Sequence, residues 1–312
     1  MVFIESWHRR SGVGVGQLLR WLALKPSKYH HWKGRRGQPP RPQASLPRTF
    51  WLLDWEKQAI KDYYLQHSQE GYRRLTFMML DENVVAVSPS SVYRVLRRAG
   101  LLARASTAPS RKGKGFEQPL GPHQHWHVDI CYLNLCGTFY YLCAILDGYS
   151  RYVVHWEIRQ QMTTAEVEII LQRAKEHFPG VQPRIISDNG PPFIAKDFKE
   201  FIRCCGMTHV RTSPFYPQSN GKIERWHQSL KKECIRPKTP GSVEEARRVV
   251  AAFVHTYNHH RLHSAIDYLV PVDKLHGRDT LILQQRKQKL IEAQRHRAQS
   301  ASPEHPKQAA KL

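Results

Sequence analysis

The region that most constrains the fold lies between residues 126 and 212, where short apolar runs follow one another at regular spacing. Three strand-like runs come first, joined by turns of only a few residues, which predicts an antiparallel meander. A helix, a strand, a second helix and a last strand follow. In chain order, the expected elements cover 126–133, 139–146, 152–158, 163–178, 184–187, 196–205 and 207–212. We therefore expect an α/β domain with a mixed five-stranded sheet and flanking helices.

Acidic residues stand at the edges of three elements in and after this region. Asp129 lies within the first strand, where alternation places its side chain on the face opposite Val128 and Ile130. Asp188 directly follows the fourth strand, and Glu224 lies on a helix that follows a proline-rich loop. A carboxylate inside a sheet is costly without a metal ion, a partner or solvent. Three carboxylates so placed are suited to holding a pair of divalent metal ions for phosphoryl chemistry.

Each of these carboxylates also has a plainer interpretation. Asp188 begins the turn sequence Asp-Asn-Gly, and most helical glutamates such as Glu224 are simply solvated. The three contexts together favour a catalytic, metal-binding triad, and oxygen ligands favour Mg²⁺ or Mn²⁺ over zinc. Asp147 ends the second strand and is expected to be structural, either helping the turn or pairing with Arg151. His227, one turn after Glu224, is left out of the predicted site.

Residues 51–102 have the pattern of three short helices. The third has clear boundaries: Ser88 as N-cap, Pro89 at the first helical position and Gly100 after the last turn. Its apolar stripe leaves hydroxyl, aromatic and arginine side chains facing outward, as in the recognition helix of a helix-turn-helix domain. The outward-facing residues expected to contact DNA are Ser90, Ser91, Tyr93, Arg94, Arg97 and Arg98. The alternative is a three-helix spacer with a solvated basic face.

The charge of the chain favours a polyanionic partner. Its formal net charge is +22, and cations concentrate in a basic arm over 1–50, a linker over 103–123 and a tail over 278–312. The arm is expected to contain one short helix at 16–24 and then a basic linker, and the tail is expected to be a frayed helix followed by a disordered segment. These segments flank the helical domain and a catalytic core over 124–277.

The remaining composition bears on the compartment. The chain has no run of eighteen apolar residues, which argues against a membrane partner, and it lacks the pattern of a signal peptide. Its six cysteines include no Cys-x-x-Cys pair and fit a reduced protein. We expect a cytoplasmic protein that is associated with the nucleoid when bound to DNA.

Three motifs resemble those of one known family. They are Thr-Ser-Pro-Phe-Tyr-Pro-Gln-Ser-Asn-Gly-Lys-Ile-Glu at 212–224, the basic helical string ending Tyr-Arg-Val-Leu-Arg-Arg-Ala-Gly-Leu at 93–101, and Tyr-Asn-x-x-Arg-x-His at 257–263. The spacing of 35 residues between Asp188 and Glu224 is similar as well. The chain resembles the DDE transposases of bacterial insertion sequences, specifically a second-frame protein, and the core of retroviral integrases. This resemblance implies a ribonuclease-H-like core preceded by an all-α helix-turn-helix domain.

The resemblance also implies an activity. The expected enzyme binds the terminal repeats of an insertion sequence, nicks DNA at the 3′ ends and joins each freed 3′-hydroxyl to target DNA, using two Mg²⁺ or Mn²⁺ ions. Lys231 and Gln218 are expected to contact the DNA end. Lys222 and Arg225, which flank the catalytic glutamate, are expected to meet phosphates.

The partners expected from the resemblance are double-stranded DNA, further copies of the chain on that DNA and the first-frame protein of the same element. Two other functions are compatible with the sequence. One is a catalytically silent DNA-binding regulator of transposition, and the other is a plain metal-dependent nuclease of the same fold.

Overall fold

The structure is a computed structural model that describes residues 2–35, 51–102, 118–212 and 220–301. Contacts divide the chain into two units, residues 1–48 and residues 49–312, and each is described by itself. Within the described residues, no helix combines the length and the apolar character that a membrane crossing requires.

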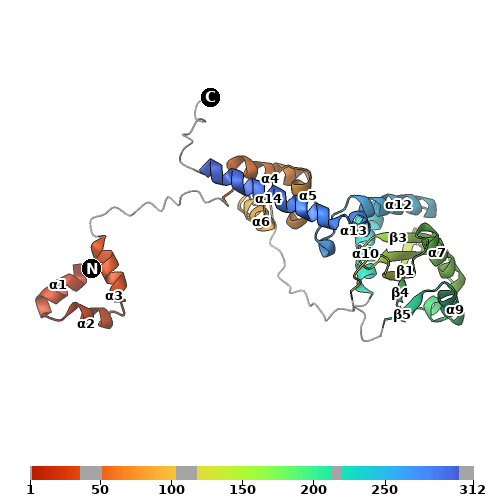
Figure 1. Ribbon diagram of the computed structural model, residues 1–312, viewed down its shortest axis with the longest axis horizontal. Helices are drawn as coiled ribbons and strands as arrows, with labels where there is room; N and C mark the ends of the chain where they lie inside the picture. The colour runs from red at the N-terminus through yellow and green to blue at the C-terminus, as the bar shows by residue number, and fades with distance from the viewer. Residues whose placement is uncertain (1, 36–50, 103–117, 213–219, 302–312) are drawn as a thin grey trace, which may run out of the picture. The chain divides into compact units, whose positions relative to one another are not determined.

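The first unit is a small three-helix bundle, not an extended arm. Its helices are α1 (Val2–Ser11), α2 (Val15–Trp21) and α3 (Pro26–Gly34) (Figure 1). They enclose a small core of Ile4, Leu18, Leu19 and Tyr29. The expected basic linker after residue 26 is therefore wrong over 26–34, because Pro26 opens a helix there instead of ending the structured segment.

The second unit begins with the three predicted helices: α4 (Asp54–Gln66), α5 (Tyr72–Asp81) and α6 (Pro89–Arg98). Helix α6 begins as expected, since the Ser88 hydroxyl accepts a hydrogen bond from Ser91 N. Gly100, with φ of +71°, follows its last turn in the left-handed conformation that favours glycine. The helices pack around a core of Ile60, Tyr63, Leu75, Met79, Val85, Val87, Val92 and Leu96.

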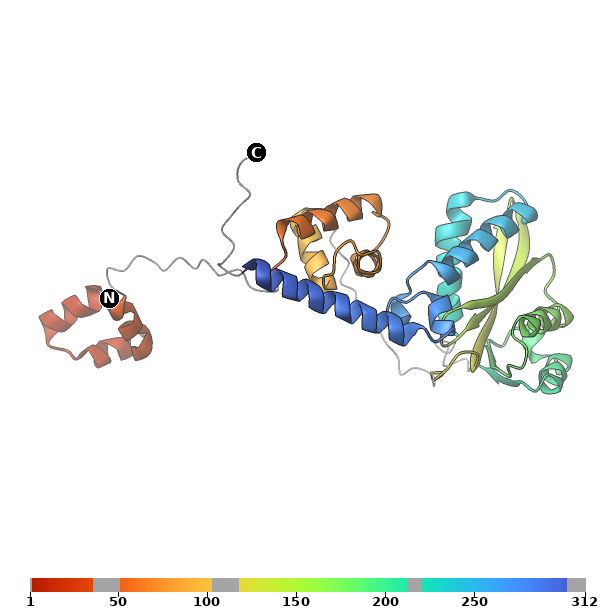
Figure 2. The same ribbon diagram turned by 45° about the horizontal axis from the view of Figure 1, so that its top comes forward.

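A long C-terminal helix, α14 (Asp279–Ala301), also packs on this helical domain. Figure 2 shows α14 running along α4–α6. Arg286 forms a two-pronged ion pair with Asp81, and Arg297 forms one with Glu56. The helix expected beyond Gly277 is thus present over residues 279–301, and its packing on the helical domain is what the sequence did not indicate; residues 302–312 lie outside the described part of the chain.

The predicted sheet is present. Strands β1 (His125–Leu135), β2 (Thr138–Asp147) and β3 (Val153–Arg159) form the antiparallel meander. Strands β4 (Arg184–Ser187) and β5 (Thr208–Arg211) run parallel to β1, giving the order β3-β2-β1-β4-β5. This is the mixed five-stranded sheet of a ribonuclease-H-like core.

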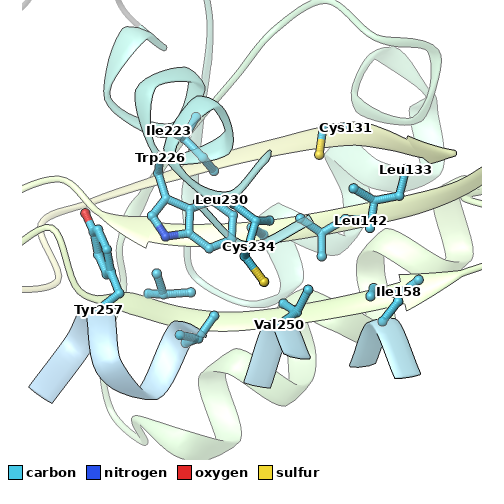
Figure 3. Packing of buried hydrophobic residues seen from close by; sticks show 14 of the residues in the cluster. Cys131, Leu133, Leu142, Ile158, Ile223, Trp226, Leu230, Cys234, Val250 and Tyr257 are labelled. Atoms are coloured by element: carbon cyan, nitrogen blue, oxygen red, sulfur yellow. The ribbon is translucent and has the colours of Figure 1, made fainter. Parts of the chain in front are cut away.

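Helices cover both faces of the sheet. One face packs on α7 (Thr164–His177) and α9 (Lys196–Cys204), and the other on α10 (Gly221–Leu230) and α12 (Val243–His259). Figure 3 shows Trp226 and Leu230 of α10 packed over Leu142 of the sheet, with Val250 and Tyr257 from α12. Short elements complete the domain: α8 (Pro191–Ile194), a π-helical turn η2 (Lys231–Ile235), α11 (Arg236–Lys238), η3 (Ser264–Ile266) and α13 (Pro271–Leu275).

Candidate active site

The parallel pairing of β1 with β4 brings two predicted acids to the same level of the sheet. His127 of β1 lies opposite Ile186 of β4. Advancing both strands by two residues places Asp129 beside Asp188, which is one residue beyond the end of β4. Neighbouring strands lie about 4.8 Å apart, so the register alone brings these carboxylates into one region.

Helix α10 supplies the third acid. Asp129 shares a strand face with Cys131, and this is the face that α10 covers. Burial raises the pKa of Glu224, and the negative charges of Asp129 and Asp188 raise it further, against the opposing effect of His227. Both aspartates therefore lie close enough to Glu224 for their charges to act on it.

His227 is a site residue that the sequence reasoning left out. Its Nδ1 lies 3.1 Å from Asp129 Oδ2, and the two side chains are 6% and 17% exposed. Burial lowers the pKa of His227, but the hydrogen bond to Asp129, with a contribution from Cys131, outweighs burial and raises it to about 9. The signal was its position three residues after Glu224, which places it on the same side of the helix.

The start of α10 is fixed to the sheet by polar contacts. Asn220 is buried; its side-chain oxygen lies 3.3 Å from His127 Nδ1, and its amide nitrogen donates to the Val128 carbonyl. Lys222 donates its ammonium to the Gly148 carbonyl at 2.9 Å. Burial, together with Arg151, lowers the pKa of Lys222 to about 7. Lys222 is thus bonded within the protein and does not project freely towards solvent.

The other predicted DNA contacts fall in different places. Arg225 is exposed on α10, next to Glu224, and Lys231 is half-buried where α10 gives way to the π-helical turn. Gln218 lies outside the described residues. On α6, Arg94, Arg97 and Arg98 are exposed as predicted.

The hydroxyl and aromatic residues of α6 are less uniform. Ser90 is exposed, whereas Ser91 and Tyr93 are half-buried. Ser91 contacts the Ser88 cap, and Arg97 lies over the Tyr93 ring at 5.8 Å.

Asp147 has the structural role expected of it in the turn. It is fully buried and accepts hydrogen bonds from His123 N at 2.8 Å, from Ser150 N at 2.7 Å and from the Ser150 hydroxyl at 2.6 Å. These bonds hold the turn between β2 and β3. With three donors already bound, Asp147 is poorly placed to serve as a metal ligand.

The motif at residues 257–263 fastens the C-terminal side of the core. Asn258 donates to the Val153 carbonyl and accepts from Val153 N, so it caps the start of strand β3. Arg261 forms an ion pair with Glu233 of the π-helical turn. Tyr257 is buried beside Trp226 of α10. These contacts brace the helix that carries Glu224.

The three acids fit divalent cations by their negative charge and by their oxygen donor atoms. Among the described residues, no three His, Cys, Asp or Glu side chains are arranged as ready ligands of one ion. Asp188 Oδ1 instead accepts from Gly190 N at 2.9 Å, and Asp129 Oδ2 faces His227. Burial raises the pKa of Glu224, and the nearby negative charges of Asp129 and Asp188 add to this effect. Carboxylate oxygens are suitable ligands for Mg²⁺.

Family comparisons agree with this architecture. Two models described as "Integrase core domain" match residues 119–217 and 205–271, and one described as "HTH-like domain" matches residues 54–108. Together they cover the core that carries the acids and the helical domain that precedes it.

Individual relatives are insertion-sequence proteins. The chain is 24% identical over 276 residues to the transposase of IS629 from Shigella sonnei, covering 85% of this chain and 92% of that one. It is 27% identical over 226 residues to transposase InsD of IS2 from Escherichia coli, covering 67% and 74%.

Among solved structures, a simian T-cell lymphotropic virus intasome aligns with a TM-score of 0.47, 20% identity and coverage of 70% and 74%. The HTLV-2 integrase catalytic core with magnesium aligns with a TM-score of 0.41, 20% identity and coverage of 50% and 99%. Taking the integrase-core and helix-turn-helix matches together with the insertion-sequence relatives, the chain is a DDE-type transposase with an integrase-like catalytic core.

Proposed function

We propose that this transposase binds the terminal repeats of its insertion sequence, nicks DNA to free a 3′-hydroxyl and joins that hydroxyl to target DNA. The observation that carries the proposal is geometric: the parallel register of β1 on β4 brings Asp129 beside Asp188, and α10, which carries Glu224, covers the sheet face that bears Asp129. The raised pKa of Glu224, caused by burial and by the charges of both aspartates against the effect of His227, is consistent with this grouping.

Asp129, Asp188 and Glu224 would hold two Mg²⁺ or Mn²⁺ ions. When bound, such ions activate the attacking oxygen and stabilise the leaving 3′-oxygen of the phosphodiester. The chain itself supplies the positions: β1 and β4 fix the aspartates by their register, and α10 fixes Glu224 through its packing on the sheet. His227 orients the Asp129 carboxylate and offsets part of the negative charge.

The DNA contacts are proposed for two surfaces. In the helical domain, α6 would lie against the terminal repeat through Ser90, Ser91, Tyr93, Arg94, Arg97 and Arg98. Near the site, Arg225, Lys231 and Gln218 would contact the DNA end. Lys222 would join them only by exchanging the Gly148 carbonyl for a phosphate oxygen. We further propose that the chain acts as a homo-oligomer on DNA, with the first-frame protein of its element as a partner.

The decisive experiment is strand transfer from a labelled duplex that carries the DNA flanking the gene, in Mg²⁺ or Mn²⁺. The wild-type chain is expected to join this duplex to plasmid, and Glu224→Gln is expected to bind it without joining. Gln228→Ala, at an exposed position one turn further along α10 that has no proposed DNA contact, is the matched control for a change at the helix surface and should retain chemistry. Joining by Glu224→Gln at the wild-type rate would disprove the assignment.

The same assay separates the alternatives. A plain nuclease would cut any duplex and form no joined product. A silent regulator would bind the element end and neither cut nor join in either metal, also when the first-frame protein is added.

A further inference from the structure

The N-terminal unit has a feature that the family matches do not cover, since they begin at residue 54. Helix α2 ends at Trp21 and α3 begins at Pro26, so a connection of four residues joins them. Within it, Ala23 has φ of +52° and its N–H returns to the Arg20 carbonyl, as in a tight left-handed turn. A connection of three or four residues between two helices is also the one found in helix-turn-helix units.

The second helix of this unit buries almost none of its surface. Tyr29 is its only buried residue, and Lys28, His30, His31, Trp32 and Lys33 are exposed. Neither α2 nor α3 has an acidic residue in its first turn, and α3 has none at all. A helix with one buried residue and several exposed cations and aromatic rings is better suited to contact a partner than to form a core.

The exposed face of α3 carries a stacked cation–aromatic pair, as α6 does. In α3, Lys28 lies over the Trp32 ring at 4.9 Å, one turn away. In α6, Arg97 lies over the Tyr93 ring at 5.8 Å, also one turn away. Both helices begin with Pro-Ser, at 26–27 and 89–90, and bury the fourth residue from their start, Tyr29 and Val92. The two helices thus share a start, an anchor and a cation stacked on an aromatic ring.

The charge of the unit identifies the class of partner. Residues 2–35 contain seven Lys and Arg and a single acid, Glu5, which gives a formal net charge of 7 − 1 = +6. The ion pairs among the described residues include none that neutralises Lys28 or Lys33, and Arg20 donates a hydrogen bond to the neutral Gln17. So much free positive charge on so small a unit matches a phosphate backbone.

We propose that residues 2–35 form a second DNA-binding module, with α3 lying against duplex DNA through Lys28, Trp32 and Lys33. This goes beyond the proposed function, in which DNA is recognised by α6 and by the surroundings of the active site. The chain would then read a duplex with two separate modules, residues 2–35 and residues 54–98.

The test is equilibrium binding of the full chain to a fluorescein-labelled 40-bp duplex from the DNA flanking the gene, in EDTA. The variant Lys28→Ala/Lys33→Ala removes two charges from α3. The control Arg9→Ala/Arg10→Ala removes two equally exposed charges from α1. The α3 pair is expected to weaken binding at least about fivefold and to reduce the slope of log Kd against log salt by about 1.8, since each lost phosphate contact lowers it by about 0.9. The α1 pair should change both much less.

Three results would overturn the proposal: no loss with the α3 pair, an equal loss with both pairs, or failure of Lys28→Arg/Lys33→Arg to restore binding. An equal loss would mean general attraction and not a contact surface on α3. Because EDTA prevents chemistry, the outcome is independent of strand transfer. A chain that never joins DNA but loses affinity with the α3 pair would contradict the proposed function and leave this inference intact.

Discussion

The three carboxylates assigned to the active site and the buried carboxylates Glu56 and Asp147 have opposite surroundings, since Asp188 and Glu224 are exposed and Asp129 is half-buried. Glu56 is 3% exposed in its side chain and is bound by Arg297 through three contacts of 2.8–3.0 Å. Asp147 accepts three hydrogen bonds. By contrast, Asp129 faces one histidine, and the charges of Asp129 and Asp188 raise the pKa of Glu224, with His227 of the same helix opposing them.

This difference distinguishes carboxylates that stabilise the fold from carboxylates that can bind a ligand. A buried carboxylate bound by three or more donors stabilises the fold, whereas an accessible one with fewer protein partners remains able to take a ligand. Chain position does not distinguish them, because Asp129 and Asp147 stand on neighbouring paired strands. The hydrogen-bond and ion-pair partners of each carboxylate determine its role. Each prediction below changes one partner or one acid to test this.

The largest effect is expected at Asp129. Asp129→Asn should lower the rate of strand transfer by about three orders of magnitude, because loss of a metal-coordinating charge forfeits several kcal/mol of transition-state stabilisation. Its free energy of unfolding should fall as well, because buried His227 loses the carboxylate that raises its pKa. Single-turnover joining kinetics, expressed per folded molecule, and urea denaturation measure the two effects. Normal joining per folded molecule would place Asp129 with the structural acids.

Arg297→Met tests the buried carboxylates that are bound by several donors within the protein. It leaves Glu56 buried without its cation, so the free energy of unfolding of the helical domain should fall by about 3–5 kcal/mol. Lys287→Met, at an exposed position on the same helix, is the control and should be nearly neutral. The double variant Glu56→Gln/Arg297→Met should recover part of the loss. Equal urea midpoints for Arg297→Met and wild type would contradict the assignment.

Asp147→Asn should destabilise the core by about 2–3 kcal/mol, since an amide group would face N–H donors in place of a carboxylate oxygen. The rate of joining per folded molecule should be close to that of the wild type. Thermal denaturation alongside the joining assay measures both. A catalytic defect without loss of stability would make Asp147 a member of the site.

The smallest effect concerns Glu157 on β3, which is bonded to His155, Arg159 and Arg173. Burial alone would raise the pKa of Glu157, but these three partners lower it from 4.5 to about 2. Its stabilising contribution is therefore present above about pH 4.5 and is lost as the pH falls towards 2. We expect this to be about 1 kcal/mol, because solvent screens the pair.

To measure this, the free energy of unfolding of wild type and Glu157→Gln would be compared at pH 6 and pH 3. The wild type should lose more on acidification. A parallel loss in both proteins would show that the partners contribute nothing.

Much of the catalytic core could be predicted from the sequence because its elements are periodic. β4 spans Arg184–Ser187 as expected, and α6 has the predicted cap at Ser88 and the left-handed Gly100. These features depend on the local spacing of apolar residues and on the residues that cap helices, and both can be seen directly in the sequence. The grouping of Asp129, Asp188 and Glu224 remains an assignment for experiment, although the register of β1 on β4 favours it.

What escaped prediction has tertiary causes. Helix α3 has one buried residue, Tyr29, so it shows no apolar stripe. Helix α14 docks through Arg286 and Arg297, which pair with Asp81 and Glu56. In the sequence alone, both arginines are indistinguishable from surface charges. His227 is an ordinary helix residue except for its distance to Asp129. In each case the decisive partner is remote in sequence or absent from the local pattern.

The packing of α14 has a consequence for synthesis on the ribosome. Glu56 and Arg297 are separated by 241 positions, so the acid emerges long before its cation exists. At about 5–20 residues per second, the interval is about 12–50 s. During that time the helical domain lacks one of its packing helices and carries an unneutralised acid. A ribosome that stops early would release a chain with an intact α4–α6 sequence but an unfinished DNA-binding domain.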